Sequence, residues 1–266
     1  MHRITRRFAE LRSQKRTGLV TFTMAYDPNR ATSLALLKSL PASGADMVEL
    51  GMPFSDPMAD GPAIQAAGIR ALKSGAKLKG VLKIVQEFRA HDADTPLILM
   101  GYYNPVQHYG TEAFVRDAAK SGADGLILVD LPPEEDAAML AACRAQGIAL
   151  IKLVTPTTDA ARLPVILQKA EGFLYYVAVT GVTGTHSATP KDIAQALTRI
   201  RAHSTLPVAV GFGIKDAKSA KAMARHADAI VVGSALVQHF AGKGTAVQKK
   251  QAALKCVRAL ARAIRP

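Results

Sequence analysis

The chain has 266 residues, of which 49% are hydrophobic and 21% charged, and it carries a formal net charge of +13. No apolar run approaches the roughly 18–20 residues of a membrane-spanning helix, which argues against a membrane partner. The positive charge is spread along the predicted helices. With no tryptophan and only 5% aromatic residues, the sequence lacks a stacking platform for nucleic acid.

A basic, amphipathic segment opens the chain, and we expect a helix over residues 4–15. This segment has no apolar core of the kind found in secretory signal peptides. Cys143 and Cys256 lie far apart in helical contexts and fit no metal-ligand spacing. Such cysteines are typical of structural thiols in a reducing compartment, so we expect a cytoplasmic protein.

Short apolar strands then alternate with longer amphipathic helices. The strands are expected at residues 19–24, 47–50, 97–100, 125–129, 149–153, 173–177, 208–211 and 229–232. The helices after the first are expected at residues 31–40, 63–74, 78–91, 111–121, 134–146, 160–169, 190–202, 216–225 and 245–265. This alternation predicts a parallel sheet, and no linker divides the chain. Eight such units in a chain near the usual length of about 250 residues predict an α/β fold, a single-domain TIM (β/α)8 barrel over residues 1–266 with an extra N-terminal helix.

The second strand leads into the most informative segment, residues 47–62. Glu49 interrupts an apolar strand, where a carboxylate is costly unless it is paired or used in chemistry. The Gly- and Pro-rich loop that follows contains Asp56 and Asp60, and a helix opens directly after it. Glu49 and Asp60 are therefore candidate catalytic acids. The alternatives are a buried ion-pair partner for Glu49, a helix N-cap for Asp60, and a turn or partner contact for Asp56.

The third and fourth strands add residues to the same end of the barrel, because functional loops follow the strands in this fold. Met100 and Tyr102 supply an apolar surface and a hydroxyl, and Asn104-Pro105 predicts a turn. Asp130 follows the fourth strand. We interpret it as a supporting or interface residue and not as a catalytic acid.

The last three strands each lead into a glycine-containing loop, at residues 180–185, 211–214 and 232–235. Glycines allow a phosphate to approach the backbone closely, and the first N–H groups of a helix bind anions. Ser234 adds a hydroxyl, and it is a candidate cap for the short helix that begins there. Three such loops in consecutive units predict a phosphate site that depends mainly on backbone donors.

The histidines do not form a metal-binding pattern, and the sequence contains neither a Ser-His-Asp arrangement nor a dinucleotide glycine fingerprint. His186, in the loop after the sixth strand, is the only histidine near the expected site. We therefore expect no metal and no nucleotide cofactor.

Together these motifs resemble the tryptophan synthase alpha chain family. The matching segments are Phe22, residues 27–28, 49–57, 59–62 and 64–65, Tyr102, residues 104–105, 181–184, 211–214 and 233–235. They extend from Phe22 to about Leu236, which is nearly the whole barrel. The long segment around residues 53–62 is specific to that family, whereas the phosphate glycines are common to many barrels.

The resemblance implies a retro-aldol cleavage of indole-3-glycerol phosphate to indole and glyceraldehyde 3-phosphate, without a cofactor. It also implies a pyridoxal-phosphate beta chain as partner in an α2β2 heterotetramer, to which indole passes for L-tryptophan synthesis. The implied catalytic residues are Glu49 and Asp60. The implied phosphate-binding residues are Gly184, Gly213, Gly233 and Ser234, and the other substrate-binding residues are Phe22, Met100, Tyr102, Tyr175, Thr183 and Phe212.

This chemistry assigns different charge states to the two acids. Glu49 would exchange protons with the substrate, which requires a pKa raised from about 4.3 toward neutrality. Asp60 would stay ionised opposite the indole nitrogen, with a pKa near about 3.9.

The chain departs from the family pattern at three places, where Tyr26 replaces a usual glycine, Ala178 replaces a usual serine, and residues 185–187 (Thr-His-Ser) lack an arginine. Two other functions stay open at this point. One is an isomerase or epimerase acting on a sugar phosphate, which would need a catalytic lysine or a metal site. The other is an inactive barrel kept as a partner-binding subunit.

Overall fold

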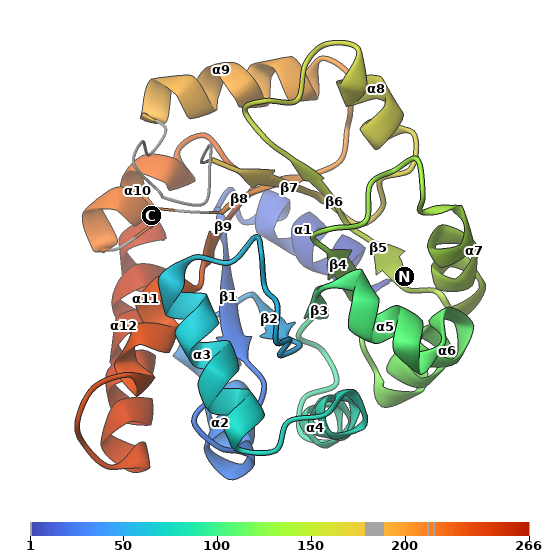
Figure 1. Ribbon diagram of the computed structural model, residues 1–266. Helices are drawn as coiled ribbons and strands as arrows, with labels where there is room; N and C mark the ends of the chain where they lie inside the picture. The colour runs from blue at the N-terminus through green and yellow to red at the C-terminus, as the bar shows by residue number, and fades with distance from the viewer. Residues whose placement is uncertain (1, 179–188, 212, 215, 266) are drawn as a thin grey trace.

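The computed structural model describes residues 2–178, 189–211, 213–214 and 216–265, and it forms a parallel β-barrel surrounded by helices (Figure 1). The strands are β1 (Gly18–Met24), β2 (Met47–Gly51), β3 (Leu97–Gly101), β4 (Gly125–Leu128), β5 (Ala149–Leu150), β6 (Lys152–Val154), β7 (Leu174–Val177), β8 (Val208–Gly211) and β9 (Ala229–Val232). The helices are α1 (Arg3–Ser13), α2 (Arg30–Ser39), α3 (Pro62–Lys73), α4 (Leu78–Arg89), α5 (Tyr103–Tyr109), α6 (Thr111–Ser121), α7 (Ala137–Gln146), α8 (Arg162–Leu167), α9 (Pro190–Arg201), α10 (Ala217–Ala224), α11 (Ser234–Val237) and α12 (Ala246–Ile264). Two short 3-10 turns, at Pro41–Ser43 and Gln238–Phe240, complete the helical segments. Within the described ranges, no helix combines the length and apolarity needed to cross a bilayer.

The barrel closes through the fifth predicted strand. The sheet order is β5-β4-β3-β2-β1-β9-β8-β7-β6, so its two ends are β5 and β6, which are separated only by Ile151. β5 pairs with β4, and β6 pairs with β7, both in parallel. The expected strand at residues 149–153 thus exists as two short pieces with different neighbours. The predicted TIM barrel is confirmed, and the described residues form nine strand segments where eight strands were expected.

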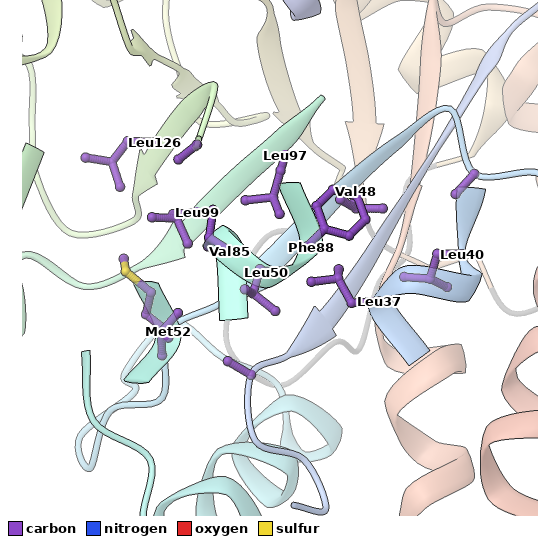
Figure 2. Close-up of a cluster of buried hydrophobic side chains, with 14 of the residues drawn as sticks. Leu37, Leu40, Val48, Leu50, Met52, Val85, Phe88, Leu97, Leu99 and Leu126 are labelled. Carbon is purple, nitrogen blue, oxygen red and sulfur yellow. The ribbon is translucent and has the colours of Figure 1, made fainter. Parts of the chain in front are cut away.

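Alternation along the strands separates the core into two layers, because successive side chains point to opposite faces of a sheet. Inward-facing side chains such as Met47, Ile98 and Ile127 form one buried cluster with Ile4 and Phe8 of α1, which closes the bottom of the barrel. Figure 2 shows the other layer, in which side chains of β2 and β3 meet those of the surrounding helices. Its members include Val48, Leu50, Leu97 and Leu99 from the strands and Leu37, Val85 and Phe88 from α2 and α4.

This alternation also decides where Glu49 points. Glu49 is two residues after Met47, so its side chain lies on the inward face of β2. In the parallel register, Glu49 is the partner of Phe22 on β1 and of Ile98 on β3. The acid therefore enters the upper part of the barrel interior, above the apolar layer.

The segment after β3 differs from the prediction. The expected turn at Asn104-Pro105 is wrong, because both residues lie in the first turn of α5. A proline is tolerated there, since its missing N–H is one of those that the start of a helix leaves unpaired. The Asp130 carboxylate accepts the Tyr103 N–H at 2.8 Å and so stabilises this helix start. The helix expected from residue 134 begins later, at Ala137.

Candidate active site

A cavity of about 490 Å³ lies at the carboxyl ends of the strands, where the catalytic sites of such barrels occur. The predicted site residues that line it are Phe22, Glu49, Asp60, Met100, Tyr102, Tyr175, Gly213, Gly233 and Ser234. Thr183, Gly184, Phe212 and His186 lie outside the described residues. The cavity therefore brings both predicted acids together with the predicted aromatic and glycine residues.

Glu49 is completely buried on β2. Neither of its carboxylate oxygens has a hydrogen-bond partner among the described residues, and no ion pair in that part of the chain involves it. The alternative of a buried ion-pair partner is therefore not supported. Burial without compensation disfavours the charged form, and it raises the pKa of Glu49 from 4.5 to about 8. Glu49 is thus mainly protonated at neutral pH and can donate a proton.

Asp60 reaches the cavity from the loop between β2 and α3. Its N–H donates to the Pro57 carbonyl at 3.1 Å, and its own carbonyl accepts the Gln65 side-chain amide at 2.9 Å. Gly61, and not Asp60, is the N-cap of α3, so the capping alternative is excluded. Burial raises the pKa of Asp60 to about 6, although hydrogen bonding with the Tyr102 hydroxyl lowers it. The expected value near 3.9 is wrong, but the carboxylate still predominates at pH 7.

Tyr102 connects the loop to the barrel. Its hydroxyl accepts the Ala59 N–H at 3.0 Å, and its ring lies 5.4 Å from the ring of Phe54, measured between centroids. Burial and the neighbouring charge of Asp60 raise the pKa of Tyr102, so the phenol stays neutral. These contacts hold the loop at residues 52–61 over the cavity, while Asp56 stays exposed at its outer side.

Tyr175 on β7 forms the opposite wall. Its pKa is raised well above the ordinary value by burial and, to a smaller extent, by the charge of Glu49. The neighbouring strand must carry a glycine here, because a Cβ atom on Gly211 would lie 2.2 Å from the Tyr175 hydroxyl oxygen. Gly211 therefore leaves the space in which the phenol reaches toward the cavity.

The far end of the cavity contains the predicted phosphate residues. Gly213 has a φ of +79°, a conformation that other residues rarely adopt, and it follows β8. Gly233 is the N-cap of α11, and Ser234 is its first residue. The Ser234 side chain makes no capping bond, so the expectation that it caps the helix is wrong. Its hydroxyl borders the cavity beside the N–H groups that the start of α11 leaves unpaired.

Comparison with known proteins identifies the family. The family model for the tryptophan synthase alpha chain matches residues 8–265. The chain belongs to this family. Enzymes of the tryptophan synthase alpha family cleave indole-3-glycerol phosphate, a carbon–carbon lyase reaction of tryptophan biosynthesis.

Solved structures of the tryptophan synthase family agree over the full length. The alpha subunit from Legionella pneumophila is 38% identical, with a TM-score of 0.90 over 99% of this chain and 98% of that one. A tryptophan synthase structure from Mycobacterium tuberculosis is 33% identical, with a TM-score of 0.91 over 100% of this chain and 99% of that one.

Tyr26, where the resemblance to the tryptophan synthase alpha family implies a glycine, has a φ of +68°. This left-handed conformation explains the glycine preference, since a side chain there is strained. Its hydroxyl side packs on Gly80 of α4, where a Cβ atom would lie 2.2 Å from the Tyr26 oxygen. The absence of a side chain at Gly80 therefore leaves the space that the Tyr26 ring occupies. Ala178, the second departure, is buried after β7.

Several apolar residues that line the cavity were not predicted from the sequence, among them Val129, Leu153 and Val177. Val129 and Leu153 follow the inward-facing Ile127 and Ile151 by two positions, so the strand period alone could have identified them. Thr155 and Gln238, two polar lining residues, have no such signal because they lie beyond the ends of β6 and α11. In the described ranges, no three His, Cys, Asp or Glu side chains are grouped closely enough to hold a metal ion together.

Proposed function

We propose that this chain cleaves indole-3-glycerol phosphate with Glu49 as the proton-transferring acid and Asp60 as the carboxylate opposite the indole nitrogen. The main support is the arrangement of two acids in the cavity. Two carboxyl groups face the same cavity, and their environments separate their pKa values to about 8 and about 6. At pH 7 one is therefore mainly protonated and the other mainly ionised, which is the division that this reaction requires.

The steps follow from those charge states. Glu49 donates its proton to C3 of the indole ring, and the positive charge that results is shared with the ring nitrogen. The Asp60 carboxylate accepts a hydrogen bond from the indole N–H and stabilises this charge. The Glu49 carboxylate then takes the proton of the 3′-hydroxyl. The C3–C3′ bond breaks, its electron pair returns to the ring, and the aldehyde of glyceraldehyde 3-phosphate forms with Glu49 protonated again.

The rest of the cavity holds the two ends of the substrate. In this proposal Phe22, Met100 and Tyr175 pack around the apolar indole. The phosphate is bound by Gly213, Gly233 and Ser234, together with Gly184, which lies outside the described residues. Thr183 and Phe212 are assigned to substrate binding from the family resemblance alone. Phosphate binding is remote from the breaking bond, so its binding energy serves to hold the reacting end in place.

The product also points to a partner. Indole is apolar and would be lost by diffusion through membranes, so direct transfer to a second enzyme is advantageous. We propose that this enzyme is a tryptophan synthase beta chain in an α2β2 complex, and that the complex works in the cytoplasm. The free thiols of Cys143 and Cys256 agree with a reducing compartment.

The test is an assay of indole release from indole-3-glycerol phosphate. Glu49→Gln removes proton transfer and is expected to lower turnover by roughly 10²–10⁴-fold. Asp60→Asn removes the charge opposite the nitrogen and is also expected to impair turnover severely.

Asp56→Asn, in the same loop but exposed, is the matched control and should retain substantial cleavage. Near-wild-type indole release by either acid variant would contradict the role assigned to that residue. Absence of indole release by the wild-type protein would favour the isomerase or the inactive-subunit alternative.

A further inference from the structure

One ion pair outside the cavity connects three elements that carry site residues. Asp27 follows β1, and Arg70 lies on α3. The Arg70 guanidinium donates two hydrogen bonds to the Asp27 carboxylate, from Nε at 2.7 Å and from Nη2 at 2.8 Å. Its Nη2 also donates to the carbonyl oxygen of Val237, the last residue of α11, at 3.3 Å. A single side chain thus joins the segment after β1, the last turn of α3 and the end of α11.

The pair is too buried to be an ordinary surface contact. Asp27 is 1% exposed, and burial raises its pKa even though the bonds from Arg70 favour the ionised form. The two parallel N–H···O bonds use the planar fork of arginine, which a lysine does not reproduce. Neither Asp27 nor Arg70 is among the described residues that line the cavity, so the pair lies outside the space that the proposed function assigns to the substrate.

α3, which contains Arg70, and α11, to which Arg70 donates a hydrogen bond, both begin at the proposed active site. α3 starts at Pro62, two residues after Asp60, so a shift or rotation of α3 moves that carboxylate. α11 is one helical turn, and its first residue is Ser234. A displacement of Val237 therefore reaches Ser234 through a segment about 6 Å long. Figure 1 shows α3 beside α11 at the end of β1, and the three elements pack directly on one another.

We propose that the Asp27–Arg70 pair is a positioning device that sets the distance between Asp60 and the phosphate-binding residues at α11. The substrate must contact Asp60 with its indole end and the start of α11 with its phosphate end. Both contacts can form at once only if α3 and α11 are held at a fixed distance from each other. The inference rests on the proposed function, because it takes Asp60 and Ser234 as the two contact points. It predicts that disturbing the pair affects phosphate binding and turnover together.

The experiment uses three variants of the full chain. Asp27→Asn keeps the shape of the side chain and removes one of the two oxygens that accept from Arg70. Arg70→Lys keeps the positive charge and removes the planar guanidinium that donates both bonds. The double variant Asp27→Asn/Arg70→Met removes the pair without leaving a buried unpaired charge, so it is expected to stay folded where a single variant could unfold. Glu87→Gln is the matched control, because it breaks a single-bonded pair, Arg30–Glu87, between α2 and α4.

For each variant we would measure kcat and KM for indole release, the affinity for glycerol 3-phosphate by calorimetry, and the folded fraction at the assay temperature. We expect kcat/KM per folded molecule to fall by roughly 10–100-fold in the single variants, since small displacements of this kind have large kinetic effects. We expect both a lower kcat and a higher KM, together with a weaker affinity for glycerol 3-phosphate. The control should match the wild type.

The inference is overturned if the three variants, corrected for folded fraction, equal Glu87→Gln in both kinetics and glycerol 3-phosphate affinity. The pair would then serve stability alone. Glycerol 3-phosphate binding does not depend on cleavage. A wild-type protein that binds it but releases no indole would therefore refute the proposed function, while the binding data would still decide the role of the pair.

Discussion

Glu49 and Asp60 are acids of similar chemistry in two different environments. Glu49 leaves a strand into the barrel interior, where its oxygens find no donor among the described residues. Asp60 lies at the edge of the cavity, where a hydrogen bond with Tyr102 partly compensates for its burial. The same physical cause, burial, raises both pKa values. The pKa of Asp60 stays lower because Asp60 is less deeply buried than Glu49 and because the hydrogen bond with Tyr102 favours its ionised form.

This difference predicts a bell-shaped dependence of kcat/KM on pH. Activity should rise with pH as Asp60 loses its proton, with an apparent pKa of about 6, and should fall as Glu49 loses its proton, with an apparent pKa of about 8. The maximum is therefore expected near pH 7. The measurement is indole release at low substrate concentration across this range, since kcat/KM reports the free enzyme.

Asp60→Asn provides the control for the pH profile. The pH profile of its residual activity should no longer show the rise assigned to Asp60 but should still show the fall at alkaline pH assigned to Glu49. A wild-type profile without change between pH 6 and pH 8 would contradict the assignment of both groups.

Individual residues differed in how well sequence reasoning could place them. Glu49 was predictable because its environment is encoded in its own strand, by Met47 and Leu50 on either side. The raised pKa of Asp60 was not predictable, because it comes from burial beside a cavity that residues of many strands line. Tyr102, which partly offsets this effect, is 42 positions away and follows a different strand. Local sequence predicted which residues were acids of interest, whereas the tertiary contact decides their charge.

Three aspartates repeat one arrangement at the amino end of the barrel. Asp46, Asp124 and Asp228 each precede a strand, and each carboxylate accepts the N–H of the first or second residue of a neighbouring strand, at 2.8–2.9 Å. The same aspartates pair with arginines, including Arg16, Arg89 and Arg201. The sequence Ser-Gly-Ala-Asp at residues 43–46 and 121–124 is the local signature of this element. Its function is to join adjacent strands where side-chain packing alone leaves N–H groups unpaired.

Asp124→Ala should therefore destabilise the barrel strongly. The change removes the carboxylate that pairs with Arg89, the acceptor of the Leu97 N–H and the bond from Arg3, and it leaves Arg89 with backbone carbonyl acceptors only. Removal of one partner of a buried pair typically costs about 3–5 kcal/mol, which we would measure as the free energy of unfolding in urea.

Asp94→Ala is the matched control, because Asp94 pairs with Arg6 at the exposed surface and such pairs contribute only about 0–1 kcal/mol. Equal stability of the two variants would show that the strand-joining arrangement is not a main support of the fold.

The phosphate-binding end yields a prediction about α11 and the turn after β8. Ser234→Ala removes one hydroxyl and leaves the backbone donors, so glycerol 3-phosphate binding should weaken by about 0.5–1.5 kcal/mol. Gly213→Val should weaken it much more, because a β-branched residue is strained at a φ of +79° and its side chain would enter the space of the anion. Calorimetric titration is the direct measurement. Unchanged affinity in the Gly213 variant would require a phosphate site elsewhere in the cavity.

Among the elements, the strands were the most predictable, because each is a short apolar run between turn residues. The bounds expected for β8 and β9 are those observed. The break between β5 and β6 was not visible, since Ile151 is as apolar as its neighbours and the change of partner comes from barrel closure. α5 was missed because Asn-Pro is a common turn sequence, and the carboxylate that supports this helix start, Asp130, comes from the next unit.

At the scale of the whole molecule, the barrel separates stability from function. The amino end is closed by α1 and by the aspartate–arginine pairs, whereas the carboxyl end contains the cavity and the loops that cover it. Sequence reasoning predicted the barrel from the alternation of elements, and the family resemblance predicted the residues that meet in its cavity. Division into one domain stays a prediction, and so does the contact with a partner chain.

The surface beside the cavity favours docking at the carboxyl end. In the loop at residues 52–61, Met58 is 71% exposed and lies two residues after the exposed Asp56. The start of α5 and the turn after β4, which contains Asp130, Pro132 and Pro133, follow strands of the same parallel sheet and so lie at the same end of the barrel. At this exposure Met58 contributes little to the core, and a methionine side chain adapts readily to the surface of a binding partner. We expect the beta chain to bind at this face.

The last prediction tests this interface. Asp56→Ala should weaken association with the beta chain more than it lowers intrinsic indole release, because Asp56 is exposed on the outer side of the loop. Asp94→Ala, at the opposite end of the barrel, should leave association unchanged. Co-purification with the cognate beta chain, followed by sizing and by indole assays with and without it, measures both effects. Binding should order the loop over the cavity and accelerate indole release. A chain that stays monomeric and keeps its rate at saturating beta chain would instead be a stand-alone indole-producing lyase.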